Sequence, residues 1–154
     1  MFNRKILIFL VLILSSCSKI IPAEFWREFD KDEIVHNFSD HGPFGGTTII
    51  DWASDNNKLD KNSIISFAEK NGWKLVDVIT VQDGELKSSK KNYSVELIVQ
   101  NNNFSTDFKN STVYLFETGI IAVKPGNSAE TQINGFLILN NNKTKLKLFH
   151  KWGE

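Results

Sequence analysis

Short strand-like runs separated by turn residues dominate the second half of this 154-residue sequence. Each run is rich in β-branched, aromatic or other apolar residues, and the gaps hold asparagine, glycine or proline, which are typical of turns. The five runs are Tyr93–Gln100, Thr112–Glu117, Ile120–Lys124, Gln132–Asn140 and Thr144–Trp152. Because short links favour pairing between successive strands, this half of the chain predicts an antiparallel meander.

Helix signals are found in the first half of the chain. An apolar cluster at helical spacing, followed by Asp30 and Glu33 in the register of a capping box, predicts a helix from about residue 23 to residue 38. A second helix is expected to begin after Asp60, which is a good N-cap, and to stop at Asn71-Gly72.

Two further strands are expected between and after these helices. The glycine-rich turn at residues 42–46 precedes the apolar, β-branched run Thr47–Trp52, and Trp73–Val81 follows the second helix. The predicted fold class is therefore α+β, with two N-terminal helices packed on one face of a curved, mainly antiparallel sheet of about five or six strands.

The charge balance and the cysteine count exclude several classes of protein. Lys plus Arg equals Asp plus Glu at 18 each, so there is no overall basic field to hold nucleic acid, and none is expected as a partner. The single cysteine, Cys17, can form neither an internal disulfide nor a structural zinc site. We expect no cofactor and no metal.

The N-terminus has the three parts of an export signal. Arg4 and Lys5 precede the apolar run Ile6–Leu14, and Ser15-Ser16-Cys17 follows it. As a helix, this run would cover only about 14 Å, roughly half of the hydrocarbon core of a bilayer. It is therefore too short to serve as a lasting transmembrane span.

The stretch Leu14-Ser15-Ser16-Cys17 resembles the lipobox of bacterial lipoproteins, in which an apolar residue and two small residues precede a cysteine. The resemblance implies that Cys17 is joined to diacylglycerol and becomes the acylated first residue after cleavage. The alternative is an ordinary secretory signal peptide. The expected division is a signal peptide over residues 1–16, a lipidated tether over 17–22 and one domain over 23–154.

The resemblance also implies a location. A lipid anchor at Cys17 would hold the protein on a membrane of the cell envelope. Ser18, the next residue, lacks the acidic character that retains enterobacterial lipoproteins in the inner membrane. We therefore expect the periplasmic face of the outer membrane rather than the inner membrane.

Known catalytic motifs are absent from the sequence. The glycine-rich stretch at residues 42–48 lacks the Gly-Lys-Ser/Thr ending of a phosphate-binding loop. Ser39, Asp40 and His41 are consecutive residues, which rarely adopt the relay geometry of a catalytic triad. The three histidines have spacings that match no known metal site: His36, His41 and His150. We therefore predict a protein that is not an enzyme.

Asp77 interrupts an alternating apolar series on the strand expected at residues 73–81. If Asp77 faced inward, a buried carboxylate would need a partner and could mark a ligand pocket. In the alternative register, Val76 and Val78 face the core and Asp77 faces water. We favour the second interpretation.

The last expected strand has one apolar face and one cationic face. The apolar side consists of Leu146, Leu148, His150 and Trp152, and the cationic side of Lys143, Lys145, Lys147 and Lys151. Lysines on a terminal edge strand commonly block edge-to-edge aggregation, and this is the favoured interpretation. The functional alternative is contact with acidic lipid headgroups or with an acidic partner.

Two aromatic residues form a second candidate contact surface. Phe44 lies in the glycine-rich turn and Trp52 ends the strand after it. Exposed aromatic side chains beside a turn make good anchors for a partner protein, although most aromatic residues belong to the core.

These features favour a membrane-anchored, non-catalytic module that holds another protein by a sheet face or a loop. Immunity proteins and inhibitors of exported toxins are often built in this way, but that subclass rests on analogy alone. The alternative is a carrier lipoprotein that encloses a small ligand or lipid between the helices and the sheet.

Overall fold

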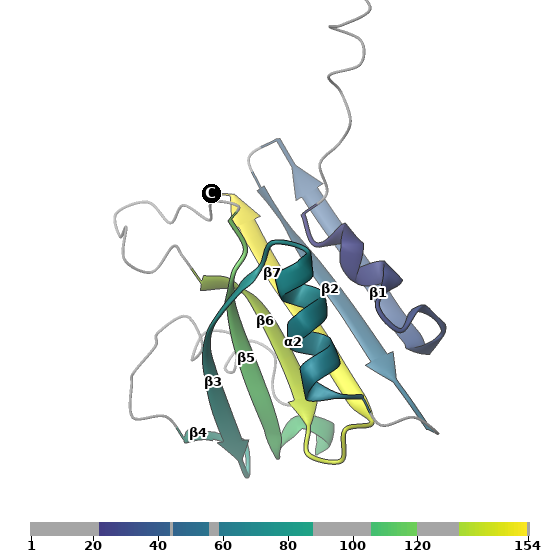
Figure 1. The fold of residues 1–154 in the computed structure, drawn as a ribbon, viewed down its shortest axis with the longest axis vertical. Helices are drawn as coiled ribbons and strands as arrows, with labels where there is room; N and C mark the ends of the chain where they lie inside the picture. Colours follow the sequence, from purple (N-terminus) through teal and green to yellow (C-terminus); the bar gives the residue numbers. More distant parts are fainter. Residues whose placement is uncertain (1–21, 44, 56–58, 88–105, 120–132, 154) are drawn as a thin grey trace, which may run out of the picture.

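The computed structural model describes residues 22–43, 45–55, 59–87, 106–119 and 133–153. These residues form one antiparallel sheet of seven strands, with a single α-helix and three 3-10 helices among them (Figure 1). The elements are η1 (Glu24–Glu28), η2 (Lys31–Glu33), β1 (Ile34–Gly42), β2 (Gly45–Ala53), α2 (Lys61–Lys70), β3 (Lys74–Gln82), β4 (Glu85–Lys87), η3 (Thr106–Phe108), β5 (Ser111–Glu117), β6 (Ile133–Asn140) and β7 (Lys145–Gly153).

The strand order across the sheet is β1-β2-β7-β6-β5-β3-β4, and every neighbouring pair is antiparallel. β5, β6 and β7 follow one another as antiparallel neighbours, which agrees with part of the predicted meander; the strand expected between β5 and β6, at residues 120–124, lies outside the described residues. Three strands (β7, β6 and β5) separate β2 from β3, and α2 lies on the connection between these two strands, over one face of the sheet (Figure 1). The last strand, β7, therefore lies in the interior of the sheet, between β2 and β6.

The main core lies between the sheet and the layer formed by α2 and η1 (Figure 1). Trp26 of η1 is fully buried at its centre, with ring centroids 5.2 Å from Phe67, 5.6 Å from Trp73 and 6.1 Å from Trp52. Such aromatic contacts stabilise a core beyond the apolar area that they bury. Trp26 thus fixes the short helix η1 to the sheet, together with the neighbouring Phe25 and Phe29.

A second apolar cluster lies on the opposite face of the sheet. It is formed by Ile79, Val81, Phe108, Val113, Leu115, Phe136 and Ile138. Because both of its faces are covered, β6 is buried at every residue except Ile133, which is partly exposed. A strand covered on two sides needs a continuous apolar run, and the sequence Phe136–Leu139 supplies one.

The prediction of two N-terminal helices is wrong. Only α2 is an α-helix among the described residues, and the expected helix over residues 23–38 is replaced by η1, η2 and the first part of β1. Ala23 and Asp30, which directly precede η1 and η2, adopt left-handed backbone conformations with φ of 67° and 38°, so one continuous helix cannot run through Asp30. The expected cap at Asp30 makes no side-chain hydrogen bond.

The other local predictions fare better. α2 is confirmed, with the Asp60 carboxylate accepting a 2.8 Å hydrogen bond from the Ser63 N–H. The strands expected at 47–52, 73–81, 112–117, 132–140 and 144–152 are each found within one or two residues of their predicted ends. The strands expected at 93–100 and 120–124 lie outside the described residues. β1 and β4 were not predicted, and the sheet is correspondingly wider than expected.

Candidate interaction surface on the edge strand

The two edges of the sheet differ in length and in charge. β4 has three residues, and its Glu85 and Lys87 form an ion pair of 2.9 Å. β1 at the other edge has nine residues and contains no lysine, arginine or proline. Natural sheets usually blunt their edges by short length, charge or proline, because an open edge can pair with another chain. β4 follows this rule, whereas β1 has only a single bulge near its start, between Ile34 and His36.

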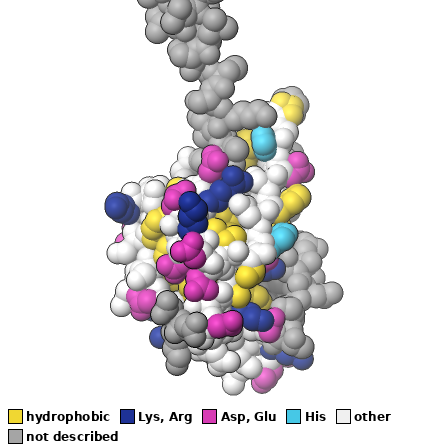
Figure 2. Space-filling model, turned by 90° about the vertical axis from the view of Figure 1, so that its right-hand side faces the viewer, with side chains coloured by type: hydrophobic (Ala, Val, Ile, Leu, Met, Phe, Trp, Pro, Cys, Tyr) yellow, Lys and Arg dark blue, Asp and Glu magenta, His cyan; other side chains and the backbone are white. Residues whose placement is uncertain are grey.

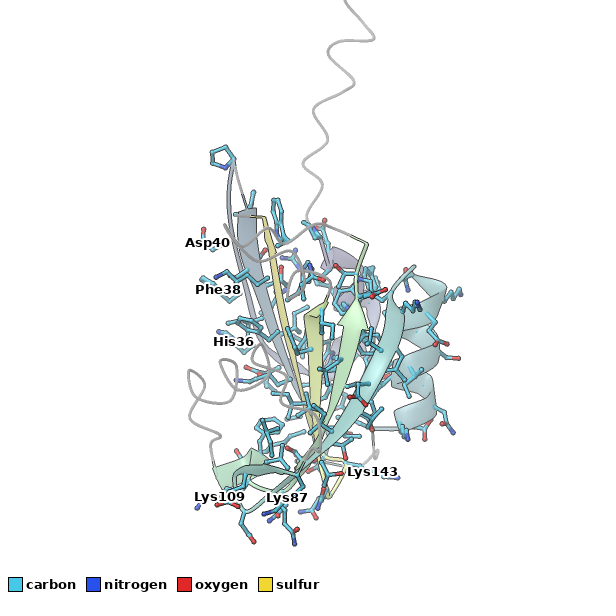
Figure 3. All side chains as sticks on the ribbon, turned by 90° about the vertical axis from the view of Figure 1, so that its left-hand side faces the viewer. His36, Phe38, Asp40, Lys87, Lys109 and Lys143 are labelled. Carbon is cyan, nitrogen blue, oxygen red and sulfur yellow. The ribbon has the colours of Figure 1, made fainter. Side chains whose placement is uncertain are left out.

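Three side chains of β1 project from the face that lies opposite α2, and we call them the β1 strip: His36, Phe38 and Asp40 (Figure 3). All three are exposed, and Phe38 leaves 46% of its surface open. Figure 2 faces this edge, and along its right-hand rim an acidic and a hydrophobic side chain lie between two histidines. The strip thus combines an apolar centre with a basic and an acidic neighbour.

An ion-pair chain connects the β1 strip to the interior strands. Nδ1 of His36 lies 3.3 Å from Oδ2 of Asp51 on β2, and Nζ of Lys147 on β7 lies 3.3 Å from Oδ1 of the same carboxylate. Oδ1 of Asp51 accepts no hydrogen bond, so its contact with Lys147 is an attraction between opposite charges without a hydrogen bond. Asp51 is partly buried, so solvent screens these contacts less than it screens fully exposed pairs. The contact with the Asp51 carboxylate orients the His36 ring.

The four lysines predicted as a cationic ladder do not act as a unit. Lys147 pairs with Asp51, and Lys145 pairs with Asp107 at 2.8 Å. Lys143 lies in the turn before β7, and Lys151 is exposed opposite Thr47 of β2. The interpretation of the lysines as guards of an edge strand is wrong, because β7 is an interior strand.

Trp52, which was predicted as a contact residue together with Phe44, is buried in the core. Trp52 is 1% exposed, and its Nε1 donates a 2.8 Å hydrogen bond to the carbonyl oxygen of Phe29. Alternation along β2 places Trp52 on the core side with Ile50, so it offers nothing to a partner. Cys17 and Phe44 lie outside the described residues.

His150 and Asp77 were the two candidates for buried polar chemistry. His150 is fully buried against the Trp73 ring, with Nε2 3.3 Å from the Thr118 hydroxyl, and that hydroxyl donates to Asn134 at 2.8 Å. Burial lowers the pKa of the His150 imidazole to about 4, so the ring is neutral at pH 7. His150 is therefore a neutral, hydrogen-bonded residue of the sheet.

Asp77 differs from both expectations. A bulge between Leu75 and Asp77 resets the alternation of β3, and Val76 and Val78 are 43% and 39% exposed rather than buried. Asp77 shares the face of Ile79 but remains partly exposed, and its Oδ1 accepts a hydrogen bond from the Val78 N–H at 2.8 Å. The carboxylate therefore has a local partner and marks no pocket.

Three lysines gather at the end of the sheet farthest from the β1–β2 hairpin: Lys87, Lys109 and Lys143 (Figure 3).

No group of three or more metal-ligating side chains occurs in the part of the chain that the structure describes. Within the same residues, no helix has the length and apolar character needed to cross a membrane.

No protein-family model matches this sequence, and neither a curated protein nor a solved structure matches it. A function for the chain therefore has to be inferred from the geometry of the described residues and from the N-terminal sequence.

The β1 strip is the candidate site that the sequence interpretation missed. Residues 34–38 were assigned to a helix because of the preceding Asp30 and Glu33. The signal that could have found the strand is the β-branched pair Ile34-Val35, followed by Phe38 and by the Gly42-Pro43 turn.

Proposed function

We propose that this chain is a lipid-anchored protein of the cell envelope, displayed on the periplasmic face of the outer membrane, that binds another polypeptide along β1 and performs no catalysis of its own. The anchor is Cys17, as the lipobox resemblance implies. The binding element is the open edge of the sheet, where an added strand would gain main-chain hydrogen bonds along nine residues.

The observation that carries this proposal is the contrast between the two sheet edges. Evolution commonly guards an exposed edge with charge or proline, and β4 is guarded in this way. β1 leaves a long edge open and places the half-exposed ring of Phe38 at its middle. An apolar anchor flanked by polar groups is the usual composition of a protein-binding surface.

The alternative of a small-ligand carrier gains no support from the main core. The space between α2 and the sheet is occupied by aromatic rings in mutual contact, among them Trp26, Phe67 and Trp73. A carrier would need a cavity at this position. We therefore put forward the binding module alone.

Two experiments on the intact chain test the proposal separately. For the anchor, Cys17→Ser should abolish incorporation of labelled fatty acid and leave an uncut or unlipidated chain. Incorporation equal to that of the wild-type protein would refute lipidation at Cys17.

For the binding strand, a photo-crosslinking phenylalanine analogue is placed at Phe38 and the cells are irradiated intact. The matched control carries the analogue at Val78, which is exposed to a similar extent on β3. We expect a defined protein adduct at position 38 and none at position 78. The absence of any adduct at position 38 would overturn the proposed binding role of β1.

A further inference from the structure

We infer that the strand bound along β1 is β1 of a second copy of this chain, paired antiparallel about a twofold axis that passes through Phe38. This inference rests on the proposed function and names the partner of the same edge. The two sheets would then continue into one another, with their β1 strips on a common face.

The pairing is possible because, among the described strands, β1 has a neighbour on one side only. In an antiparallel strand, successive residues direct their N–H and C=O groups alternately to the two sides. A bulge interrupts the register between Ile34 and His36. From His36 to Gly42, β2 takes one set, so the other set faces the open edge. Every residue of β1 carries an N–H, because Pro43 lies beyond the end of the strand.

The side chains of the β1 strip are complementary to their own twofold image. Pairing centred on Phe38 sets the two phenylalanine rings against each other across the axis. It also sets His36 opposite Asp40 of the second copy, and Asp40 opposite His36 of the second copy. Aromatic pairs and oppositely charged pairs are the cross-strand combinations that stabilise antiparallel sheets.

This register satisfies the backbone as well as the side chains. Each residue that lies a given number of positions before Phe38 meets the residue that lies the same number of positions after Phe38 in the second copy. The N–H and C=O groups at the open edge of one copy therefore face those at the open edge of the other. A slip by one residue would break this match. A slip by two residues in either direction would remove both pairs between His36 and Asp40. One register alone satisfies all of these conditions.

The His36 ring is held ready for such a contact. Its Nδ1 faces the Asp51 carboxylate of β2, which is itself paired with Lys147 of β7. Nε2 lies on the other side of the imidazole ring and is the atom that would reach Asp40 of the second copy. Asp51 thus acts as a positioning residue for the pair across the axis.

The edges of the sheet also explain why assembly would stop at two copies. A twofold contact through β1 uses the same surface on both chains and closes on itself. Among the described strands, the free edges of the pair would then be the two β4 strands, which are short and charged. Anchoring to one membrane would raise the effective concentration of the chains and favour the contact.

The register is tested by cysteine substitution in the full-length chain, with copper–phenanthroline as the oxidant in intact cells. Phe38→Cys places two thiols directly across the axis, at the separation that a disulfide spans. Val35→Cys is the matched control, because position 35 is more exposed, at 66%, yet its twofold mate lies six residues along the partner strand. The wild-type chain is the background control, because any disulfide that it forms must use Cys17, its only cysteine.

We expect the disulfide-linked dimer to be at least about tenfold more abundant for Phe38→Cys than for Val35→Cys. Equal crosslinking of the two single variants would overturn the inference, because random collision would produce that result.

A charge exchange tests the same register without a cysteine. Asp40→Lys places a cation opposite His36 in its own dimer, and His36→Glu places an anion opposite Asp40. When the two variants are mixed, both pairs across the axis become complementary. We expect the differently tagged variants to co-purify with each other at least about tenfold more than either does with itself. Equal association in all three combinations would overturn the register.

The outcomes separate this inference from the proposed function. A crosslink from position 38 to a different protein would retain β1 as a binding strand but exclude the second copy as its partner. The absence of any crosslink from position 38, with the variants folded as judged by circular dichroism, would overturn both.

Discussion

The indole ring of Trp73 lies against the bare backbone of Gly135. A Cβ atom on Gly135 would lie 2.6 Å from Cζ3 of Trp73 and 2.8 Å from Cγ2 of Thr118. Trp73 also contacts the rings of Phe116 and His150, so it is enclosed on several sides. The glycine on β6 is therefore required by the close approach of a side chain and by no unusual backbone angle.

Gly135→Ala is expected to lower the free energy of unfolding by about 1–3 kcal/mol, because the added methyl group overpacks this part of the core. Urea denaturation followed by tryptophan fluorescence measures the change. Gly42→Ala is the control, since the nearest atom to its Cβ would be 3.8 Å away. Equal stability of the Gly135 variant and the wild type would show that Trp73 can move aside.

The hydrogen bond from Trp52 to Phe29 provides a second test of how η1 is fixed to the sheet. Trp52→Phe removes the indole N–H, so the buried carbonyl oxygen of Phe29 loses this hydrogen bond. Trp26→Phe removes a similar volume, but the Nε1 of Trp26 has no hydrogen-bond partner. We expect Trp52→Phe to be the more destabilising change, by about 1–3 kcal/mol in the free energy of unfolding. Equal losses would contradict a stabilising role for this bond.

The parts of the fold that the sequence predicts are those set by local signals. Asp60 caps α2 through the Ser63 N–H, and Asn71-Gly72 follows its end as expected, with Gly72 at a φ of 86°. The strands with β-branched and apolar runs were likewise found near their predicted ends. At residues 30–42, however, pairing with β2 along eight residues outweighs a weak helical capping pattern.

The position of each strand in the sheet could not be read from local patterns. The lysines of β7 look like the guards of an edge, yet Lys145 and Lys147 are paired with Asp107 and Asp51, which are distant in the sequence. The true edge, β1, was hidden by its assignment to a helix. The β1 strip was therefore missed as a candidate site, because Phe38 is the single apolar residue between Val35 and Gly42 and gives no alternating pattern.

The buried imidazole of His150 should make stability depend on pH. Its folded pKa of about 4 lies below the ordinary value of 6.5, so the unfolded chain binds the proton more readily. The contribution to stability is complete above about pH 6.5 and is lost as the pH falls toward 4. From pH 7 to pH 5 this single group should lower the free energy of unfolding by about 2 kcal/mol.

His150→Gln isolates this contribution, because glutamine keeps a polar side chain that does not titrate. The difference in unfolding free energy between the wild type and this variant should shrink on going from pH 7 to pH 5, as measured by urea denaturation. A difference that stays constant over this range would show that His150 has the same pKa in the folded and unfolded chains.

Lys143 closes the turn between β6 and β7 in a conformation that disfavours a side chain. Its φ is 59°, its N–H donates a 2.9 Å hydrogen bond to the Asn140 carbonyl, and its own carbonyl accepts from the Leu59 N–H at 2.7 Å. Because these bonds hold the backbone in the left-handed region, Lys143→Gly should raise the free energy of unfolding by roughly 0.5–1 kcal/mol. Lys151→Gly, at an exposed strand position, should lower it instead. Thermal and urea denaturation of the two variants measure the contrast, and a Lys143→Gly chain no more stable than the wild type would show that the lysine side chain contributes stabilising contacts that outweigh the backbone strain.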